Sequence, residues 1–448
     1  MTHPPPDLLA RQLAWLDTHA PDVAAAVVRA PPHAEVVEVA GVPRRTLRID
    51  GIQLCGAVRP DDEAALQAQR IPPGARTATV YGVAQGDLPR VLLRRPELQR
   101  LEVVVLEPGA LREVLTRFDQ AGWMQDPRVR IRVPTADERP LAPWALAPAA
   151  LRLANPAVWT LRDQLVLALG LAYQQRGFAY LDDQLHERLV ANAELLATDG
   201  DVAELFGRAS GRRVVVAGSG PTLADEAAWL RAHRETVTLV AVNSALRPLL
   251  LADIVPDVVV AVDGHENLVR HLACPPALAP EAWAILLAPV PLVYAPALHP
   301  DALRGWPGPR YATLLSSRRY DPLEATLPRG RLWCAGTVTQ TALDLAARMG
   351  ATDIVLVGVD LGYPDDRTHA EGAVAAVTVP AHERRYSIED GLGGAIRSDV
   401  TLIGYLRDLE DWIADRPHLR VRKRGRAGAR MRGAPWLDDR EDGDDARD

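Results

Sequence analysis

The sequence Arg-Val-Val-Val-Ala-Gly-Ser-Gly-Pro-Thr-Leu, residues 213–223, decides the fold class. A short apolar run leads into two closely spaced glycines, and Thr222 followed three residues later by Asp225 is typical of a helix start. A buried strand that passes through glycines into a helix is typical of parallel α/β sheets. The glycines let backbone N–H groups approach an anion, and the helix N-terminus adds partial positive charge. The turn therefore predicts a site for a nucleotide phosphate or ribose, the alternative being a tight turn without a ligand.

Similar apolar runs follow along the chain and extend the predicted sheet. Continuous apolar segments, typical of strands buried on both faces, occur at Thr238–Val242, Val258–Val262, Ala284–Ala288, Arg331–Cys334 and Ile354–Gly358. Helical patterns lie between them at Ala224–His233, Glu266–Leu272 and Val338–Met349. This alternation predicts an α/β fold with a central doubly wound, Rossmann-like domain.

Polar residues follow the ends of these predicted strands, where open α/β sheets bind their ligands. From the glycine turn we expect ligand contacts by Gly218, Ser219, Gly220, Pro221 and Thr222. From the later strand ends we expect contacts by Asn243, Asp263, Gly336, Thr337, Asp360 and Tyr363. The alternative for Asn243 and Asp263 is that each caps a helix.

The rest of the chain is predicted to add a smaller N-terminal α/β domain and a C-terminal helical extension. Strands at Thr77–Val83, Leu101–Leu106 and Val129–Val133 place the first domain in residues 1–150, and Ala142–Pro156 is rich in alanine and proline like a linker. The turn Gly82–Gly86 matches a nucleotide-binding motif poorly, so we expect no cofactor there. The further predicted parts are a helical connector (151–210), a catalytic domain (211–398) with a lid near 364–398, a C-terminal helix and basic strand (399–437) and an acidic disordered tail (438–448).

Composition excludes several classes of function. The chain has 448 residues and a net charge of −7, which argues against nucleic-acid binding. Its one lysine, Lys423, lies in an arginine-rich run near the C-terminus, so P-loop, kinase and Schiff-base mechanisms lack their motif lysine. The three cysteines are far apart, which argues against a zinc site or a disulfide framework. No signal peptide or membrane span is recognised, and we expect a cytoplasmic protein.

The segment Arg416–Arg432 contains eight basic residues and no acidic residue. A solvated edge strand is the simpler interpretation. The alternatives are a docking face for an acidic acceptor protein and a partner for the acidic tail of the chain itself.

Several of these motifs together resemble one family. Gly218–Leu223, Val242–Leu246, Pro256–Asp263, Gly336–Gly350 and Gly358–Leu361, with His369-Ala370, are similar to the central domain of the motility-associated factor (Maf) glycosyltransferases. That domain type resembles bacterial sialyltransferases and is shared with the MptE-like 6-hydroxymethylpterin pyrophosphokinases. The resemblance implies transfer of a nonulosonic acid from a CMP-sugar donor to Ser or Thr of a protein acceptor such as flagellin.

The implied reaction is a direct displacement with inversion, which needs a base for the acceptor hydroxyl and stabilisation of the leaving phosphate. His369 and His382 are the candidate bases, and Arg384, Arg385 and Tyr386 are candidates for holding the donor phosphate or the sugar carboxylate. We expect no required metal or other cofactor. The alternatives are a Mg²⁺-dependent pterin pyrophosphokinase, in which Asp263 and Asp360 would bind the metal, and a non-catalytic nucleotide-binding relative.

Overall fold

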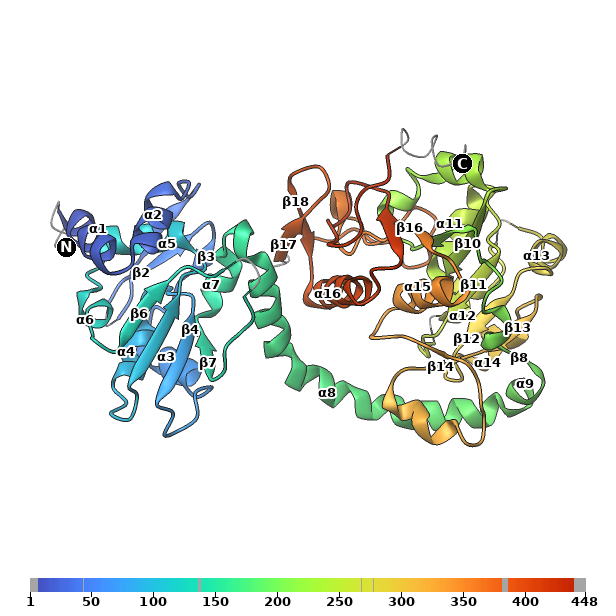
Figure 1. Ribbon diagram of the computed structural model, residues 1–448, viewed down its shortest axis with the longest axis horizontal. Coiled ribbons are helices and arrows are strands. Elements are labelled where there is room, and N and C mark those ends of the chain that lie inside the picture. Colours follow the sequence, from blue (N-terminus) through green and yellow to red (C-terminus); the bar gives the residue numbers. More distant parts are fainter. Residues whose placement is uncertain are drawn as a thin grey trace. The chain divides into compact units, whose positions relative to one another are not determined.

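The computed structural model describes residues 7–438 except 43, 136–137, 267, 277 and 381–385, with residues 171–184 described by their backbone alone. The chain divides into two compact units, Met1–Leu169 and Gly170–Asp448 (Figure 1). The boundary falls inside one continuous helix, α8 (Trp159–Ala191), which lies within the predicted helical connector, residues 151–210.

The first unit is built on a four-stranded parallel sheet in the order β6-β5-β4-β7. Its strands are β4 (Thr77–Tyr81), β5 (Arg100–Val104), β6 (Val129–Arg132) and β7 (Trp144–Leu146). Its helices include α1 (Leu8–His19), α2 (Pro21–Arg29), α3 (Pro60–Ala68), α4 (Asp87–Leu93), α5 (Pro108–Arg117) and α6 (Ala121–Met124). A separate antiparallel sheet contains β1 (Val36–Val39), β2 (Thr46–Ile49) and β3 (Ile52–Gln53). The small N-terminal α/β domain is as the sequence predicts.

The predicted linker Ala142–Pro156 is wrong. Its apolar residues form β7, which pairs with β4, and α7 (Pro148–Leu153) follows directly. Ala145 is fully buried in the sheet. The segment is rich in proline because one proline precedes the strand and another starts the helix, not because it is a spacer.

The switch point of the first sheet, between β4 and β7, is filled by protein atoms. At the end of β4, Val83 and Ala84 donate backbone hydrogen bonds to Glu107 Oε1 at 2.7 and 3.1 Å. A Cβ atom added to Gly82 would lie 2.0 Å from the Cβ of Ala150. The donors that such a turn offers to a phosphate are therefore used by the chain's own carboxyl group.

We expect Glu107→Ala to lower the free energy of unfolding by about 1–3 kcal/mol, because two buried N–H groups lose their acceptor. Glu107→Gln keeps an acceptor oxygen. Burial raises the pKa of Glu107, so the stability that its protonated form contributes declines as the pH rises through that raised pKa. Urea unfolding of both variants and the wild type at pH 5 and pH 8 measures this. Between pH 5 and pH 8, the free energy of unfolding of the glutamine variant should rise relative to that of the wild type. A difference between the two that does not change with pH would contradict this role of Glu107.

The second unit contains an eight-stranded parallel sheet in the order β19-β16-β9-β10-β11-β12-β13-β8. The central strands are β9 (Arg213–Ala217), β10 (Val237–Val242), β11 (Val258–Ala261) and β16 (Asp353–Val357). The outer ones are β8 (Gly200–Asp201), β12 (Leu292–Tyr294), β13 (Arg310–Ala312) and β19 (Arg420–Lys423). The doubly wound Rossmann-like fold predicted from the sequence is confirmed.

Helices connect these strands. They include α9 (Ala193–Thr198), α10 (Ala227–His233), α11 (Asn243–Leu251), α12 (Leu268–Leu272), α13 (Pro280–Leu287), α14 (Pro300–Arg304), α15 (Val338–Arg348) and α16 (Val400–Ala414). The fully buried strands β9 and β10 form the centre of the main core. None of the described helices combines the length and apolar character needed to cross a bilayer.

Two predicted strands of this unit are corrected. Ala284–Ala288 lies in and directly after helix α13, which begins at Pro280, and the strand of this region is β12. A short apolar run does not distinguish a buried strand from a helix, and a proline at the first helical position favours the helix here. Of Arg331–Cys334 only Arg331–Leu332 is a strand, β15, which pairs with β14 (Leu314–Leu315) outside the main sheet.

The predicted lid is partly ordered secondary structure. Its described residues include a turn at Pro364–Asp366 and a hairpin of β17 (Tyr386–Glu389) and β18 (Ala395–Ser398). The acidic tail beyond Asp438 lies outside the described residues.

The basic segment Arg416–Arg432 contains an edge strand of the main sheet, as predicted, but that strand is mostly buried and not solvated. Its strand β19 pairs with β16, and Val421, Arg422 and Lys423 are buried. Several arginines are paired within the unit: Arg422 with Asp353 at 2.6 Å, Arg424 with Glu226 at 2.5 Å and Arg432 with Glu410 at 2.8 Å. One contact reaches the start of the acidic tail, between Arg426 and Asp438 at 2.7 Å. These pairs use much of the charge that a docking face would need.

Candidate functional site

The glycine turn after β9 lies against the end of β16, where the order of the second sheet reverses. Gly218 and Gly220 donate backbone hydrogen bonds to Val357 O and Gly358 O at 2.8 and 2.7 Å. A Cβ atom added to Gly218 would lie 2.6 Å from Gly358 O, and one added to Gly220 would lie 2.5 Å from Asp360 Oδ2. Both glycines are thus required by the contact between the two strand ends, whether or not an anion binds.

The side chain of Asp360 stabilises this contact between the two strand ends. Its Oδ2 accepts the Thr222 N–H at 2.9 Å and its Oδ1 accepts the Thr222 hydroxyl at 2.5 Å. The residue is only 3% exposed. Burial raises the pKa of Asp360, and the nearby Lys423 ammonium opposes that rise. Thr222 and Asp360, both predicted to contact the donor, bind each other and so hold the turn, and Asp360 also lines the pocket beside it.

A pocket of about 260 Å³ opens above the turn. Hydroxyl groups are common in its lining, which includes Ser219, Ser244, Thr337, Thr339, Thr368 and Tyr405. The Ser244 hydroxyl donates to the Ser219 hydroxyl at 2.7 Å and so joins the turn to helix α11. Ser244 near the start of α11 and Val338 at the start of α15 both line the pocket. Two helix N-termini and several hydroxyl groups suit an anionic group such as a phosphate.

His369 lies at this pocket, beside the turn. The backbone N–H of the next residue, Ala370, donates to Ser219 O at 2.8 Å and fixes the segment there. Within the described part of the chain, the buried His369 Nδ1 has no hydrogen-bond partner. Burial lowers the pKa of His369, against a smaller opposite effect of the backbone of Ala375. The ring is therefore neutral at pH 7, with one nitrogen able to accept a proton.

Several of the other predicted site residues lie outside the pocket. Gly336 (φ +137°) lies beneath Tyr405, where an added Cβ would come within 2.6 Å of that ring. Asn243 is buried at the start of α11 and Asp263 is exposed, accepting the His265 N–H at 2.9 Å. The hydroxyl of buried Tyr363 donates to Asp399 at 2.5 Å. None of Asn243, Asp263, Pro221 and Tyr363 lines the pocket.

Tyr386 is the first residue of β17 and does not line the pocket either. His382, Arg384 and Arg385 lie outside the described residues.

Four hydroxyl-bearing lining residues were not predicted from the sequence: Ser244, Thr339, Thr368 and Tyr405. Ser244 directly follows Asn243, and the register of a helix start decides which of the two faces the pocket. Thr339 belongs to the run after Cys334, and Tyr405 comes from α16, which no motif marks. His271 on α12 was also missed; burial and the neighbouring His369 lower its pKa.

Lys423 requires a correction. From its position in a basic segment near the C-terminus, we expected Lys423 to lie outside any functional site. The residue is instead fully buried near the switch point. Its Nζ donates to Ala429 O at 2.5 Å and lies 5.0 Å from the centre of the Trp436 ring. Burial lowers the pKa of Lys423 to about 8, although the Asp360 carboxylate acts in the opposite direction.

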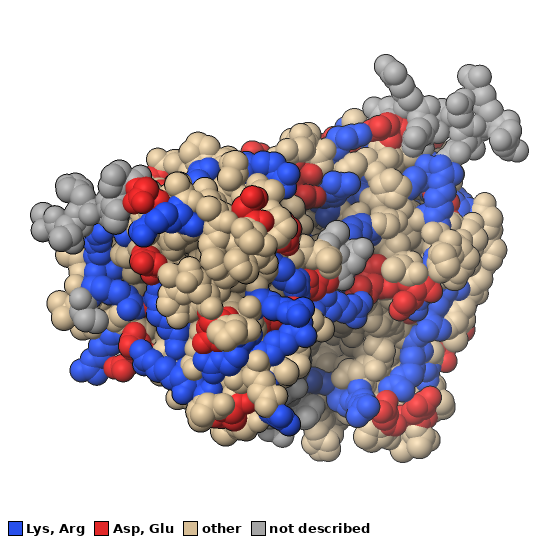
Figure 2. Space-filling model, turned by 60° about the vertical axis from the view of Figure 1, so that its left-hand side comes forward, with Lys and Arg blue, Asp and Glu red and all other residues tan. Residues whose placement is uncertain are grey.

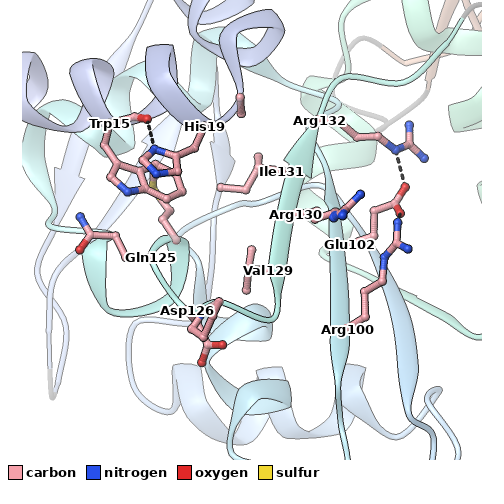
Figure 3. Close-up of a pocket in the computed structure, with 13 residues that line it drawn as sticks. Trp15, His19, Arg100, Glu102, Gln125, Asp126, Val129, Arg130, Ile131 and Arg132 are labelled. Carbon is pink, nitrogen blue, oxygen red and sulfur yellow. Dashed lines mark hydrogen bonds and ion pairs between the residues drawn. The ribbon is translucent and has the colours of Figure 1, made fainter.

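A larger pocket, of about 770 Å³, lies in the first unit at strand β6 (Figure 3). The rings of Trp15 and His19 stack on one side of it, with centroids 4.4 Å apart. On the other side Glu102 pairs with Arg132, and with Arg100 at 3.2 Å. No predicted site residue lines this pocket.

On the face shown in Figure 2, basic and acidic side chains are interspersed.

The fold and the pocket at its switch point define a Rossmann-like α/β domain suited to an anionic ligand. Residues 187–366, which lie in the second unit, match the family model described as 6-hydroxymethylpterin diphosphokinase MptE-like. The resemblance predicted from the sequence is confirmed over that range.

A solved structure of a MAf glycosyltransferase from Magnetospirillum magneticum AMB-1 is similar at 15% identity and a TM-score of 0.44. The similarity covers 96% of this chain and 74% of that one. No curated protein matches the sequence.

We expect Gly220→Ala to lower the free energy of unfolding by about 1–3 kcal/mol, because the added Cβ overlaps the Asp360 carboxylate. The turn should move away from β16 and weaken anion binding. The matched control is Gly122→Ala in helix α6, where an added Cβ meets no atom within 4 Å. Thermal unfolding of both variants measures the difference, and equal melting temperatures would contradict the packing argument.

Proposed function

We propose that the protein is a glycosyltransferase that transfers a nonulosonic acid from a CMP-sugar to Ser or Thr hydroxyl groups of a protein acceptor such as flagellin. The observation that carries the proposal is the pocket at the switch point. Hydroxyl groups and residues from the starts of two helices line it together with His369, whose buried Nδ1 has no hydrogen-bond partner in the described part of the chain. The sequence resemblance of residues 218–223, 242–246 and 358–361 to the Maf proteins supports this class of enzyme.

The pocket suits the leaving group of this reaction. A CMP-sugar releases a nucleoside monophosphate, whose developing charge needs stabilisation but no divalent metal. The N-termini of α11 and α15 and the hydroxyl groups of Ser219, Ser244 and Thr337 supply positive potential and hydrogen-bond donors. No arginine or lysine is among the described residues that line the pocket.

His369 would act as the base. The acceptor hydroxyl transfers its proton to the free Nδ1, the oxygen forms a bond with the anomeric carbon, and the bond from that carbon to the phosphate oxygen breaks. The electron pair of the broken bond stays on CMP, and the configuration at the anomeric carbon inverts. His382, Arg384, Arg385 and Tyr386 remain further candidates from the sequence, for the base or for holding the donor phosphate and the sugar carboxylate.

The matched family name favours a second candidate, a pterin pyrophosphokinase. That reaction needs Mg²⁺, with Asp263 and Asp360 as the predicted ligands. The residues present fit this poorly, because both oxygens of Asp360 accept hydrogen bonds from Thr222. Within the described ranges, no group of three or more His, Cys, Asp or Glu side chains is close enough to hold a metal ion. A third reading is a non-catalytic nucleotide-binding relative.

Thermal shift with CMP, CDP, ATP and GTP, each with and without Mg²⁺, separates these candidates. A ligand that binds the native state raises the melting temperature according to its affinity and concentration. We expect CMP and CDP to stabilise the protein without metal. Stabilisation by ATP only with Mg²⁺ would favour the pyrophosphokinase, and no effect of any nucleotide would contradict both enzymes.

We expect His369→Ala to reduce transfer from a CMP-nonulosonate at least 100-fold, because a positioned base contributes about 10²–10⁴-fold. CMP binding should be retained. Since burial lowers the pKa of His369, wild-type transfer should be constant from pH 7 to 8 and decline only below the usual histidine range. The control is His418→Ala, at an exposed position. Full activity of the His369 variant in a transfer assay would exclude this base.

A further inference from the structure

The chain uses arginine at every basic position except one, and that exception is the buried Lys423. The space around its Nζ is small. A Cβ atom added to Gly428 would lie 3.0 Å from Lys423 Nζ and 2.5 Å from Asp360 Oδ1, so both groups face the same glycine. A compact ammonium group fits this space, whereas the broader guanidinium of arginine would not.

The segment that follows β19 encloses this pair. The backbone N–H of Ala429 donates to Asp360 O at 2.8 Å, and its carbonyl accepts the Lys423 ammonium at 2.5 Å. Gly425 (φ +82°) approaches so closely that an added Cβ would lie 2.4 Å from the Thr222 hydroxyl. The C-terminal segment therefore contacts both members of the hydrogen bond that holds the glycine turn.

We propose that Lys423 is a positioning residue of the anion pocket: its ammonium group balances the charge of Asp360, and Asp360 in turn holds Thr222 and the glycine turn against β16. The MptE-like match ends at residue 366, so this role belongs to a part of the chain outside the matched domain. Lys423 does not line the pocket and acts only through Asp360.

The charges near the pair are few. Asp225 adds a negative charge that disfavours ionised Asp360, and Thr222 stabilises the ionised form by two hydrogen bonds. Arg424 and Glu226, from β19's end and the start of α10, pair with each other at 2.5 Å. Lys423 is thus the group whose charge most favours ionised Asp360.

The test uses the full chain with Lys423→Met, the double variant Lys423→Met/Asp360→Asn, and Arg420→Met as an exposed control on the same strand. Without the ammonium group, Asp360 is tolerated when protonated but becomes an unpaired buried charge when ionised. Its stabilising contribution is therefore lost as the pH rises through its raised pKa. The deficit in melting temperature of Lys423→Met against wild type should grow between pH 5 and pH 7.5. The double variant, which has no charge to balance, should show no such growth.

The positioning role is read from CMP affinity, and this readout rests on the proposed function. We expect Lys423→Met to raise the Kd for CMP at least tenfold at pH 7.5, with partial recovery in the double variant and no change in Arg420→Met. If Lys423→Met lowers the melting temperature but binds CMP as tightly as the wild type, then Lys423 has only a structural role and the proposal is overturned. A wild-type chain that does not bind CMP would contradict the proposed function. The melting temperatures, measured without ligand, would then still test the pair, and a deficit independent of pH would overturn it.

Discussion

The second unit depends on one contact, between the turn that ends β9 and the residues that end β16. Two glycines remove the Cβ atoms that would separate these strand ends, and the Asp360 carboxylate accepts two hydrogen bonds from Thr222 across them. The pocket at this contact is lined by both strand ends and by residues at the starts of α11 and α15. Close packing of the two strand ends and close approach of an anion both require glycine at these positions. A glycine turn alone is therefore weak evidence for a ligand.

The two parallel sheets of the chain differ at their switch points: that of the first unit is filled by protein atoms, and that of the second unit lies beside a pocket. In the first unit the corresponding donors are bonded to Glu107, and Ala150 packs onto Gly82. In the second unit Asp360 accepts the N–H and the hydroxyl of Thr222, and a pocket that Ser219, Gly220 and Asp360 line lies at the turn. The carboxyl group of the first unit therefore bonds to two backbone donors of its turn, whereas that of the second unit bonds to one.

The central strands could be predicted from the sequence because their information is local: a buried apolar run followed by glycine or a polar residue. Ala284–Ala288 was wrong because its apolar run fits a helix as well, and Pro280 decided for the helix. Lys423 could not be placed, since its burial depends on β19 pairing with β16, far away in the sequence. Likewise Thr222 and Asp360 were correctly located at strand ends, but only the three-dimensional contact shows that they face each other. Tyr405 carries no sequence signal because its helix follows the motif-bearing region.

The pairing of β19 with β16 has a consequence for how the protein is made. A ribosome delivers the glycine turn and β16 well before it delivers the strand that covers the edge of β16 and the lysine near Asp360. During that interval the nascent domain has an unpaired strand edge and a buried acid without its counter-charge. The glycine turn therefore acquires its full support only after β19 has paired with β16, later than the central strands of the sheet.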